Sequence, residues 1–324
     1  QLWRTQTLKK RAENQSKSSE PLLKMVLMEK MKQSSNLKVL MGAAVLGVFP
    51  TNQLLISLES GELQHISAKS IIFATGAREK VLPFKGWTLP GVMTLGAAQI
   101  LLKNQGVIPS SSILVAGAGP LPYLLAGQIL SYGGDVDAML DRSTIKSTVS
   151  GFRFFLDQLP KVTQAISALG KIGMNRVPLK FCTQVVEAKG NDSLEEVIVA
   201  KIKSDGTILP GSKTHYKTKT LVCGEGFVSN IELPQQAGCK LRYAIEKGGW
   251  YVNVDDRMAT SLPDVYAAGE ITGVGGGEKG IIEGNIAALS VLNSINLLKN
   301  LSYKKRLGRL IKKRRRFLQL GKFL

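Results

Sequence analysis

The feature that most constrains the fold of this chain is a glycine-rich turn between an apolar strand and an apolar helix. Residues 112–116 predict a buried strand, and the sequence GAGPLP leads from it into a helix at residues 121–132. A second apolar strand follows at residues 136–140 and ends at Asp141. A strand, a helix and a second strand at this spacing form a βαβ unit, so the sequence predicts an α/β fold with a parallel sheet.

The same turn predicts a dinucleotide site. Gly117, Gly119 and Pro120 lie where backbone N–H groups and the helix dipole can hold a pyrophosphate. Asp141 stands 22 residues after Gly119, where a carboxylate accepts hydrogen bonds from a ribose 2′-hydroxyl. Pro122, however, replaces the third glycine of the GxGxxG pattern. The alternative is a structural turn of this shape that binds no nucleotide.

Two further strand ends indicate a second nucleotide domain around the first. Thr75 and Gly76 follow the apolar strand at residues 70–74, and Gly269 and Glu270 follow the strand in VYAAGE. The first pair precedes the GAGP turn, and the second comes long after it. This order is expected when a chain leaves one domain, builds an inserted domain and returns. The order therefore predicts one nucleotide-binding α/β domain inserted in another.

Apolar patterning predicts the remaining elements. We expect helices at residues 21–33, with one buried face, at 95–103 and at 281–298. Short strands separated by glycine, proline or asparagine predict a small antiparallel sheet. These strands are expected at residues 37–40, 43–49, 53–58 and 64–66.

The net charge of +19 belongs to the two ends of the chain. Residues 303–324 hold ten Lys or Arg and no acid, and residues 1–40 hold nine basic and three acidic side chains. The remaining residues carry 24 basic and 21 acidic side chains, without a basic stripe typical of nucleic-acid binders. We therefore expect no nucleic-acid partner. The tail keeps regularly spaced leucines, so it is predicted to be an amphipathic helix that serves as a connector, a partner-docking helix or a solvated helix end.

The chemistry of single side chains is sparse. The cysteines are far apart, without CxxC or metal-ligand spacing, and no metal site is expected; they are Cys182, Cys223 and Cys239. His65 and His215 have no neighbouring carboxylate or nucleophile in a motif, so both are expected at the surface and no catalytic residue is assigned. No apolar run has the length of a membrane span and no signal peptide is recognisable, which favours a cytoplasmic location.

Three segments carry a family resemblance. They are IIFATGAREKVLPFKGWTLPGVMTLGAAQILLKNQGVIPSSSILVAGAGPL, LVCGEGFVSNIEL and TSLPDVYAAGEITGVGGGEKGIIEGNIAALS. They resemble the FAD-binding larger subunit of the opine oxidase, hydrogen cyanide synthase and hydroxyproline or proline dehydrogenase group, in the pyridine nucleotide-disulfide oxidoreductase superfamily. The resemblance extends over roughly residues 20 to 320, and GWTLPGVMT is its most discriminating part.

The resemblance implies two nested Rossmann-like, three-layer α/β domains, with FAD in the first and, at the GAGP turn of the second, NAD or another adenine nucleotide. The residues that it places against FAD are Thr75, Gly76, Gly269, Glu270, Gly275, Gly276 and Ile281. Glu270 stands where the family usually has aspartate, so its carboxylate must shift to reach a ribityl hydroxyl. The family's N-terminal FAD-phosphate motif and C-terminal cysteine-rich region are not recognisable, which predicts a chain truncated at both ends.

The implied domain limits are residues 1–105 and 246–300 for the incomplete FAD-binding domain, 106–245 for the inserted NAD-like domain and 301–324 for a basic helical tail. The implied function is electron transfer through FAD, while a smaller flavoprotein subunit oxidises an amino acid or an opine-like secondary amine. Two alternatives stay open. One is a non-catalytic scaffold that binds a nucleotide or a partner protein, and the other is an NAD(P)H-dependent flavin reductase.

Overall fold

The protein is described by a computed structural model, which covers residues 3–4, 19–153, 159–297 and 301–320. The chain forms two compact units. The first comprises Gln1–Gln33 and Glu79–Gly226, and the second comprises Ser34–Arg78 and Phe227–Leu324. Each unit contains segments from two parts of the sequence. The expected domain limits at residues 105, 245 and 300 stay a prediction.

The first unit is built on a five-stranded parallel sheet with the strand order β11-β10-β9-β15-β7. The helix α4 connects β9 to β10, so the predicted βαβ unit is confirmed. The bounds are β7 (Val92–Thr94), β9 (Ile113–Gly117), α4 (Pro120–Ser131), β10 (Ala138–Asp141), β11 (Leu179–Lys180) and β15 (Thr220–Gly224).

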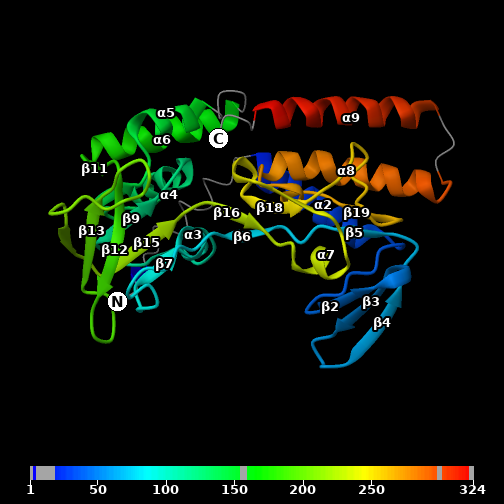
Figure 1. Ribbon diagram of the computed structural model, residues 1–324, viewed down its shortest axis with the longest axis horizontal. Coiled ribbons are helices and arrows are strands. Elements are labelled where there is room, and N and C mark those ends of the chain that lie inside the picture. Colours follow the sequence, from blue (N-terminus) through cyan, green and yellow to red (C-terminus); the bar gives the residue numbers. More distant parts are fainter. Residues whose placement is uncertain (1–2, 5–18, 154–158, 298–300, 321–324) are drawn as a thin grey trace. The chain divides into compact units, whose positions relative to one another are not determined.

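Alternating side chains of β9 bury both faces of this sheet. Ile113 and Val115 contribute to a core that contains residues of α3 (Leu95–Asn104) and α4, whereas Leu114 and Ala116 contribute to a second core. The second core contains residues of a three-stranded antiparallel sheet. Its strands are β12 (Thr183–Lys189), β13 (Glu196–Lys201) and β14 (Thr214–Lys217). The unit therefore has three layers, a helical layer, a parallel sheet and an antiparallel sheet (Figure 1).

The second unit is centred on the parallel pair β5 (Ile71–Phe73) and β19 (Val265–Ala267). One core holds Tyr266 and Ala268 together with residues of the long helices, and another holds the opposite side chains of the same strands. The helices α8 (Gly277–Ser294) and α9 (Leu301–Leu320) lie side by side (Figure 1). The other elements are β2 (Ala44–Phe49), β3 (Gln53–Ser57), β4 (Leu63–Ser67), α7 (Glu232–Gln236), β17 (Leu241–Ala244) and β18 (Gly249–Val252).

The described parts of the chain contain further helices, strands and 3-10 turns. They are β1 (Trp3–Arg4), α2 (Ser19–Gln33), β6 (Ala77–Glu79), β8 (Val107–Ile108), α5 (Ile145–Arg153), α6 (Leu159–Met174) and β16 (Phe227–Ser229), with the 3-10 turns η1 (Pro50–Asn52), η3 (Ile245–Lys247) and η4 (Glu270–Thr272). Among the residues described, no helix is both long and apolar enough to pass through a bilayer.

Two expectations about the N-terminal region are wrong. The helix predicted at residues 21–33 exists as α2, but its apolar side chains Val26, Leu27, Met28 and Met31 are exposed, so it has no buried face over that stretch. The residues 37–40 form no strand, and the antiparallel sheet begins only with β2. The other three strands predicted for this sheet are confirmed by β2, β3 and β4, which pair antiparallel.

Candidate functional site

The two strand ends that were expected to hold a flavin lie beside each other in the second unit. Ile71 is paired with Val265 and Phe73 with Ala267, and the Ala268 N–H donates to the Phe73 carbonyl at 3.0 Å. Because the two strands are parallel, their carboxyl ends meet at one edge. The turns that begin after β5 and after β19 therefore face the same space, at the kind of edge where open α/β sheets bind their ligands.

The turn after β5 is fixed by Asn230, which no sequence motif indicated. The Thr75 hydroxyl donates to the Asn230 carbonyl at 2.6 Å, and the Asn230 side-chain amide donates to the Thr75 carbonyl at 2.9 Å. Gly76 has a φ of 72°, and a Cβ placed on it would meet nothing within 4 Å. The turn thus presents bare backbone toward open space. The only sequence signal for Asn230 is its place in the segment LVCGEGFVSN.

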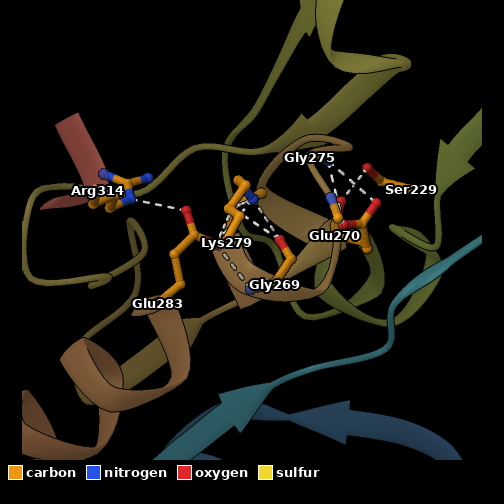
Figure 2. Close-up of polar contacts among 9 residues, drawn as sticks. Ser229, Gly269, Glu270, Gly275, Lys279, Glu283 and Arg314 are labelled. Carbon is orange, nitrogen blue, oxygen red and sulfur yellow. Dashed lines mark hydrogen bonds and ion pairs between the residues drawn. The ribbon is translucent and has the colours of Figure 1, made fainter. Parts of the chain in front are cut away.

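The turn after β19 starts at Gly269, whose φ of 86° favours glycine. Its N–H donates to Glu283 Oε2 at 2.9 Å, and its carbonyl accepts from Lys279 Nζ at 2.8 Å (Figure 2). A Cβ on Gly269 would approach only the Gly280 Cα, at 3.9 Å. The N–H and the carbonyl of Gly269 are therefore both held by side chains of α8, and the carbonyl also accepts from the Thr272 N–H and hydroxyl, each at 3.0 Å. The side of Gly269 where a Cβ would lie stays open to close approach.

Glu270 points into its own loop. Its Oε1 accepts from the Gly276 N–H at 2.5 Å, and the Gly275 N–H lies 3.2 Å from Oε1 and 3.3 Å from Oε2. The carboxylate thus satisfies N–H groups at the start of α8, where a negative charge is favoured by the helix dipole. The Ser229 hydroxyl donates to the Glu270 carbonyl at 2.7 Å (Figure 2). Ile281, in the second turn of α8, has 45% of its surface exposed.

A buried carboxylate lies directly behind these turns. Glu283 has 0% of its surface exposed, and it lies between Lys279, at 2%, and Arg314 of α9, at 8%. Lys279 Nζ is 2.9 Å from Glu283 Oε2, and Arg314 Nε is 2.8 Å from Oε1 (Figure 2). Burial raises the pKa of the Glu283 carboxyl, but the two cations and their hydrogen bonds outweigh it, so that its pKa lies below the ordinary value. Glu283 is therefore ionised at neutral pH.

The residues present fit a flavin dinucleotide. Gly76, Gly269 and Gly276 all have positive φ, and the first two face space that no side chain fills. Backbone that is free of Cβ atoms can approach a pyrophosphate or a ring closely, and the N–H groups just before α8 can bind an anion that displaces the Glu270 carboxylate from them. The structure brings together Thr75, Gly76, Gly269, Glu270, Gly275 and Gly276. Their contact with FAD stays a prediction.

The predicted second dinucleotide turn lies in the first unit. Gly117 ends β9, Gly119 precedes α4 with a φ of 78°, and Pro120 is the first residue of that helix. A Cβ on Gly117 would lie 2.0 Å from the Gly224 carbonyl oxygen and 3.1 Å from Pro122 Cγ. Gly117 is thus required by close packing against β15, and the buried ring of Pro122 occupies the place beside it.

Asp141 is enclosed by this unit's own side chains. It has 4% of its surface exposed, and it accepts hydrogen bonds from the Tyr123 hydroxyl at 2.7 Å, the Thr148 hydroxyl at 2.8 Å and the Ser143 N–H at 2.7 Å. Burial and the neighbouring Asp141 raise the pKa of Tyr123, which keeps its proton on the phenol. A ribose would have to displace these donors. No motif in the sequence indicated Tyr123 or Thr148 as partners of Asp141.

A cavity of about 470 Å³ lies at the carboxyl edge of the same sheet. Gly117, Arg142 and Glu225 contribute to its wall together with apolar side chains such as Phe84 and Trp87. Arg142 Nη1 is 3.2 Å from Glu225 Oε2, and burial raises the pKa of the Glu225 carboxyl against the opposing effect of Arg142. The charged pair and the apolar wall make this cavity suitable for a small molecule with both polar and apolar parts.

Comparison with known proteins identifies the family to which this chain is similar. The family model described as pyridine nucleotide-disulphide oxidoreductase matches residues 1–290. The chain is 31% identical to the hydrogen cyanide synthase subunit HcnB of Pseudomonas protegens over 262 residues, which are 81% of this chain and 56% of that protein. It is 32% identical to an opine oxidase subunit of Rhizobium meliloti over 267 residues, 82% of this chain and 49% of that protein. The chain thus spans about half the length of these curated relatives.

Solved structures of low sequence identity share the fold. L-proline dehydrogenase from P. horikoshii superposes with a TM-score of 0.57 at 18% identity, over 88% of this chain and 48% of that one. Thioredoxin reductase from T. acidophilum superposes with a TM-score of 0.55 at 20% identity, over 78% of this chain and 74% of that one. The expected Rossmann-type α/β fold is therefore confirmed. With the family model matched over most of its length, this chain belongs to the pyridine nucleotide-disulphide oxidoreductase family.

Proposed function

We propose that this chain is the nucleotide-binding part of an FAD-dependent oxidoreductase subunit. In this proposal it carries electrons from the oxidation of an amino acid or an opine-like secondary amine, which a partner flavoprotein subunit performs. The observation that carries the proposal is the single edge formed by the Thr75–Gly76 turn, the Gly269 turn and the loop before α8. The names of two relatives, subunits of hydrogen cyanide synthase and of opine oxidase, support a multi-subunit oxidase or dehydrogenase.

The chain's own residues would bind and orient the cofactor. FAD would supply reversible two-electron transfer. Gly76 and Gly269 would let the backbone approach the dinucleotide, and the Gly275 and Gly276 N–H groups would bind its polar portion in place of the Glu270 carboxylate. Asn230 would keep the first turn in place through its paired hydrogen bonds to Thr75. No acid–base side chain is proposed, and the substrate is assigned to the partner subunit.

The support is weaker for a nicotinamide dinucleotide at the GAGP turn. Gly117, Gly119 and Pro120 have the geometry of a phosphate-binding turn, which favours a nucleotide. Asp141, by contrast, already accepts three hydrogen bonds in a buried environment, which disfavours a ribose contact. The same observation weakens the alternative of an NAD(P)H-dependent flavin reductase. An adenine nucleotide held without Asp141 would agree with both observations.

Flavin retention tests the main proposal. The purified chain is mixed with FAD, desalted and scanned for flavin absorbance, and its dissociation constant is measured from the quenching of flavin fluorescence. Gly269→Ala places a Cβ at a φ of 86° on the turn and is expected to weaken FAD binding at least tenfold, or about 1.4 kcal/mol. Gly206→Ala is the matched control, because Gly206 has a φ of 85° and equally open surroundings in a turn of the first unit.

The control should lose a similar amount of stability and no FAD affinity. A wild-type chain that folds but retains no flavin would refute the proposed function. Equal FAD affinity in the Gly269→Ala and wild-type chains would show that the flavin lies elsewhere.

A further inference from the structure

Arg314 differs from the other basic side chains around it on α9. Lys312, Lys313 and Arg315 are exposed, as expected for a strongly basic helix, whereas Arg314 is buried with 8% of its surface exposed. Leu307 on the same helix is also buried, and it packs in a core with residues of β19 and α8. The basic helix therefore does not simply extend the chain. It is packed onto the second unit through one arginine and an apolar side.

The ion pair of Arg314 leads directly to the turn of the proposed flavin site. Arg314 Nε donates to Glu283 Oε1 at 2.8 Å, and the other oxygen of the same carboxylate accepts from the Gly269 N–H at 2.9 Å (Figure 2). One buried carboxylate thus joins α9 to the backbone of the turn. Thr272 also donates to Oε2, at 2.7 Å, which fixes the 3-10 turn that follows Gly269.

Lys279 cannot replace Arg314 as the charged donor to Glu283 Oε1. Its ammonium group donates to Glu283, to the Gly269 carbonyl at 2.8 Å and to the Thr272 hydroxyl at 2.7 Å, so its three donors are all in use. Without Arg314, Glu283 Oε1 loses its charged donor in a buried position. Such a carboxylate is expected to rotate or to admit water, because an uncompensated charge is unfavourable in the interior. Either response moves the acceptor of the Gly269 N–H.

We propose that Arg314 is a positioning residue for the flavin, and that docking of α9 through the Arg314–Glu283 pair sets the geometry of the Gly269 turn. This inference rests on the proposed function, since it assigns the turn to FAD. In this proposal the basic helix α9 holds the Gly269 turn in place, whatever its exposed face contacts. It also predicts that FAD binding and α9 docking stabilise each other, because linked equilibria are reciprocal.

The experiment compares four variants of the full chain. Arg314→Met removes the charge but keeps the length of the side chain, and Arg314→Lys restores a cation. Arg315→Met is the control for charge, because Arg315 is exposed and pairs with Asp256 at the surface. Leu307→Ala is the control for stability, because it loosens the packing of α9 without removing a partner of Glu283. The dissociation constant for FAD and the midpoint of thermal unfolding are measured for each.

We expect Arg314→Met to weaken FAD binding by about tenfold and Arg314→Lys to recover most of that loss. Arg315→Met and Leu307→Ala should stay within about twofold of wild type, although Leu307→Ala lowers the unfolding midpoint. Equal FAD affinity in Arg314→Met and Arg315→Met would overturn the inference. So would a loss in Leu307→Ala as large as that in Arg314→Met. If Arg314→Met does not fold, Arg314→Gln takes its place: FAD binding about tenfold weaker than in Arg315→Met supports the inference, and equal binding in the two variants overturns it. A wild-type chain without flavin refutes the proposed function itself.

Discussion

The replacement Glu283→Gln gives the sharpest test of how the second unit is held together. The wild-type carboxylate accepts hydrogen bonds from four groups, the Gly269 N–H, the Thr272 hydroxyl, Lys279 Nζ and Arg314 Nε. A glutamine of the same size keeps one oxygen acceptor, but its amide N–H₂ then faces one of the two cations. The variant therefore leaves two buried positive charges without a counter-ion.

The magnitude follows from that uncompensated charge. Removing one partner of a buried ion pair costs about 3 to 5 kcal/mol, and here the removed partner serves two cations, so we expect the upper part of that range. The change is measured as the free energy of unfolding of the second unit, in urea, by the fluorescence of Trp250 in a chain whose Trp3 and Trp87, in the first unit, are replaced by phenylalanine. Glu232→Gln is the control, because it breaks a pair with Arg78 whose side chains are both more than half exposed, and it should cost less than about 1 kcal/mol.

The pH dependence checks the sign of the same effect. The folded-state pKa of Glu283 lies below its ordinary value of 4.5, so its contribution is present above pH 4.5 and is lost as the pH falls toward the folded-state pKa. The wild-type chain should therefore lose its advantage over Glu283→Gln in acid. A difference of less than about 1 kcal/mol at pH 7, or one that does not shrink below pH 4.5, would refute the reasoning.

Two further predictions concern carboxylates at motif positions. Glu270→Asp shortens the side chain that reaches the Gly275 and Gly276 N–H groups, so these donors should be released at a cost of about 1 kcal/mol of stability, as in the loss of a helix cap. If the flavin uses these donors, FAD binding should become stronger. Unchanged affinity in a flavin titration would contradict that use. Tyr123→Phe leaves a buried oxygen of Asp141 with one donor fewer, so the free energy of unfolding should fall by about 1 to 3 kcal/mol in a urea titration. A calorimetric titration with NADH should show no loss of affinity. Weaker NADH binding would instead place Asp141 in a nucleotide site.

The elements that the sequence predicts well are those whose pattern is local. The strand expected at residues 112–116 is β9 at Ile113–Gly117, and the helix that follows starts at Pro120, because apolar runs and a Gly-Pro turn define strand and helix without distant partners. The amphipathic tail is α9 for the same reason. The burial of α2 was mispredicted, because a periodic apolar face says nothing about whether another element covers it.

The candidate site shows the same limit at the level of single contacts. Motif order was sufficient to bring Thr75, Gly76, Gly269 and Glu270 to one edge, since parallel pairing of β5 and β19 follows from the fold. Asn230 and Arg314 were missed, because they reach these turns from 155 residues and 31 residues away from their partners in the sequence. No local pattern relates residues at such separations. The sequence predicted that the basic tail is a connector, a docking helix or a solvated end, and it did not indicate which residue pairs with Arg314.

Asp141 and Glu270 together show why a carboxylate at a motif position does not by itself define a ligand contact. Asp141 ends the strand β10 and Glu270 follows the strand β19; spacing assigned Asp141 to a ribose, and the family resemblance assigned Glu270 to a ribityl chain. In the structure each accepts hydrogen bonds from its own unit, Asp141 from Tyr123, Thr148 and the Ser143 N–H, and Glu270 from the loop before α8. They differ in exposure, because Asp141 is buried whereas Glu270 is only partly so. A bound nucleotide can therefore compete for Glu270 far more readily than for Asp141, which makes the second unit the stronger candidate for the working cofactor site.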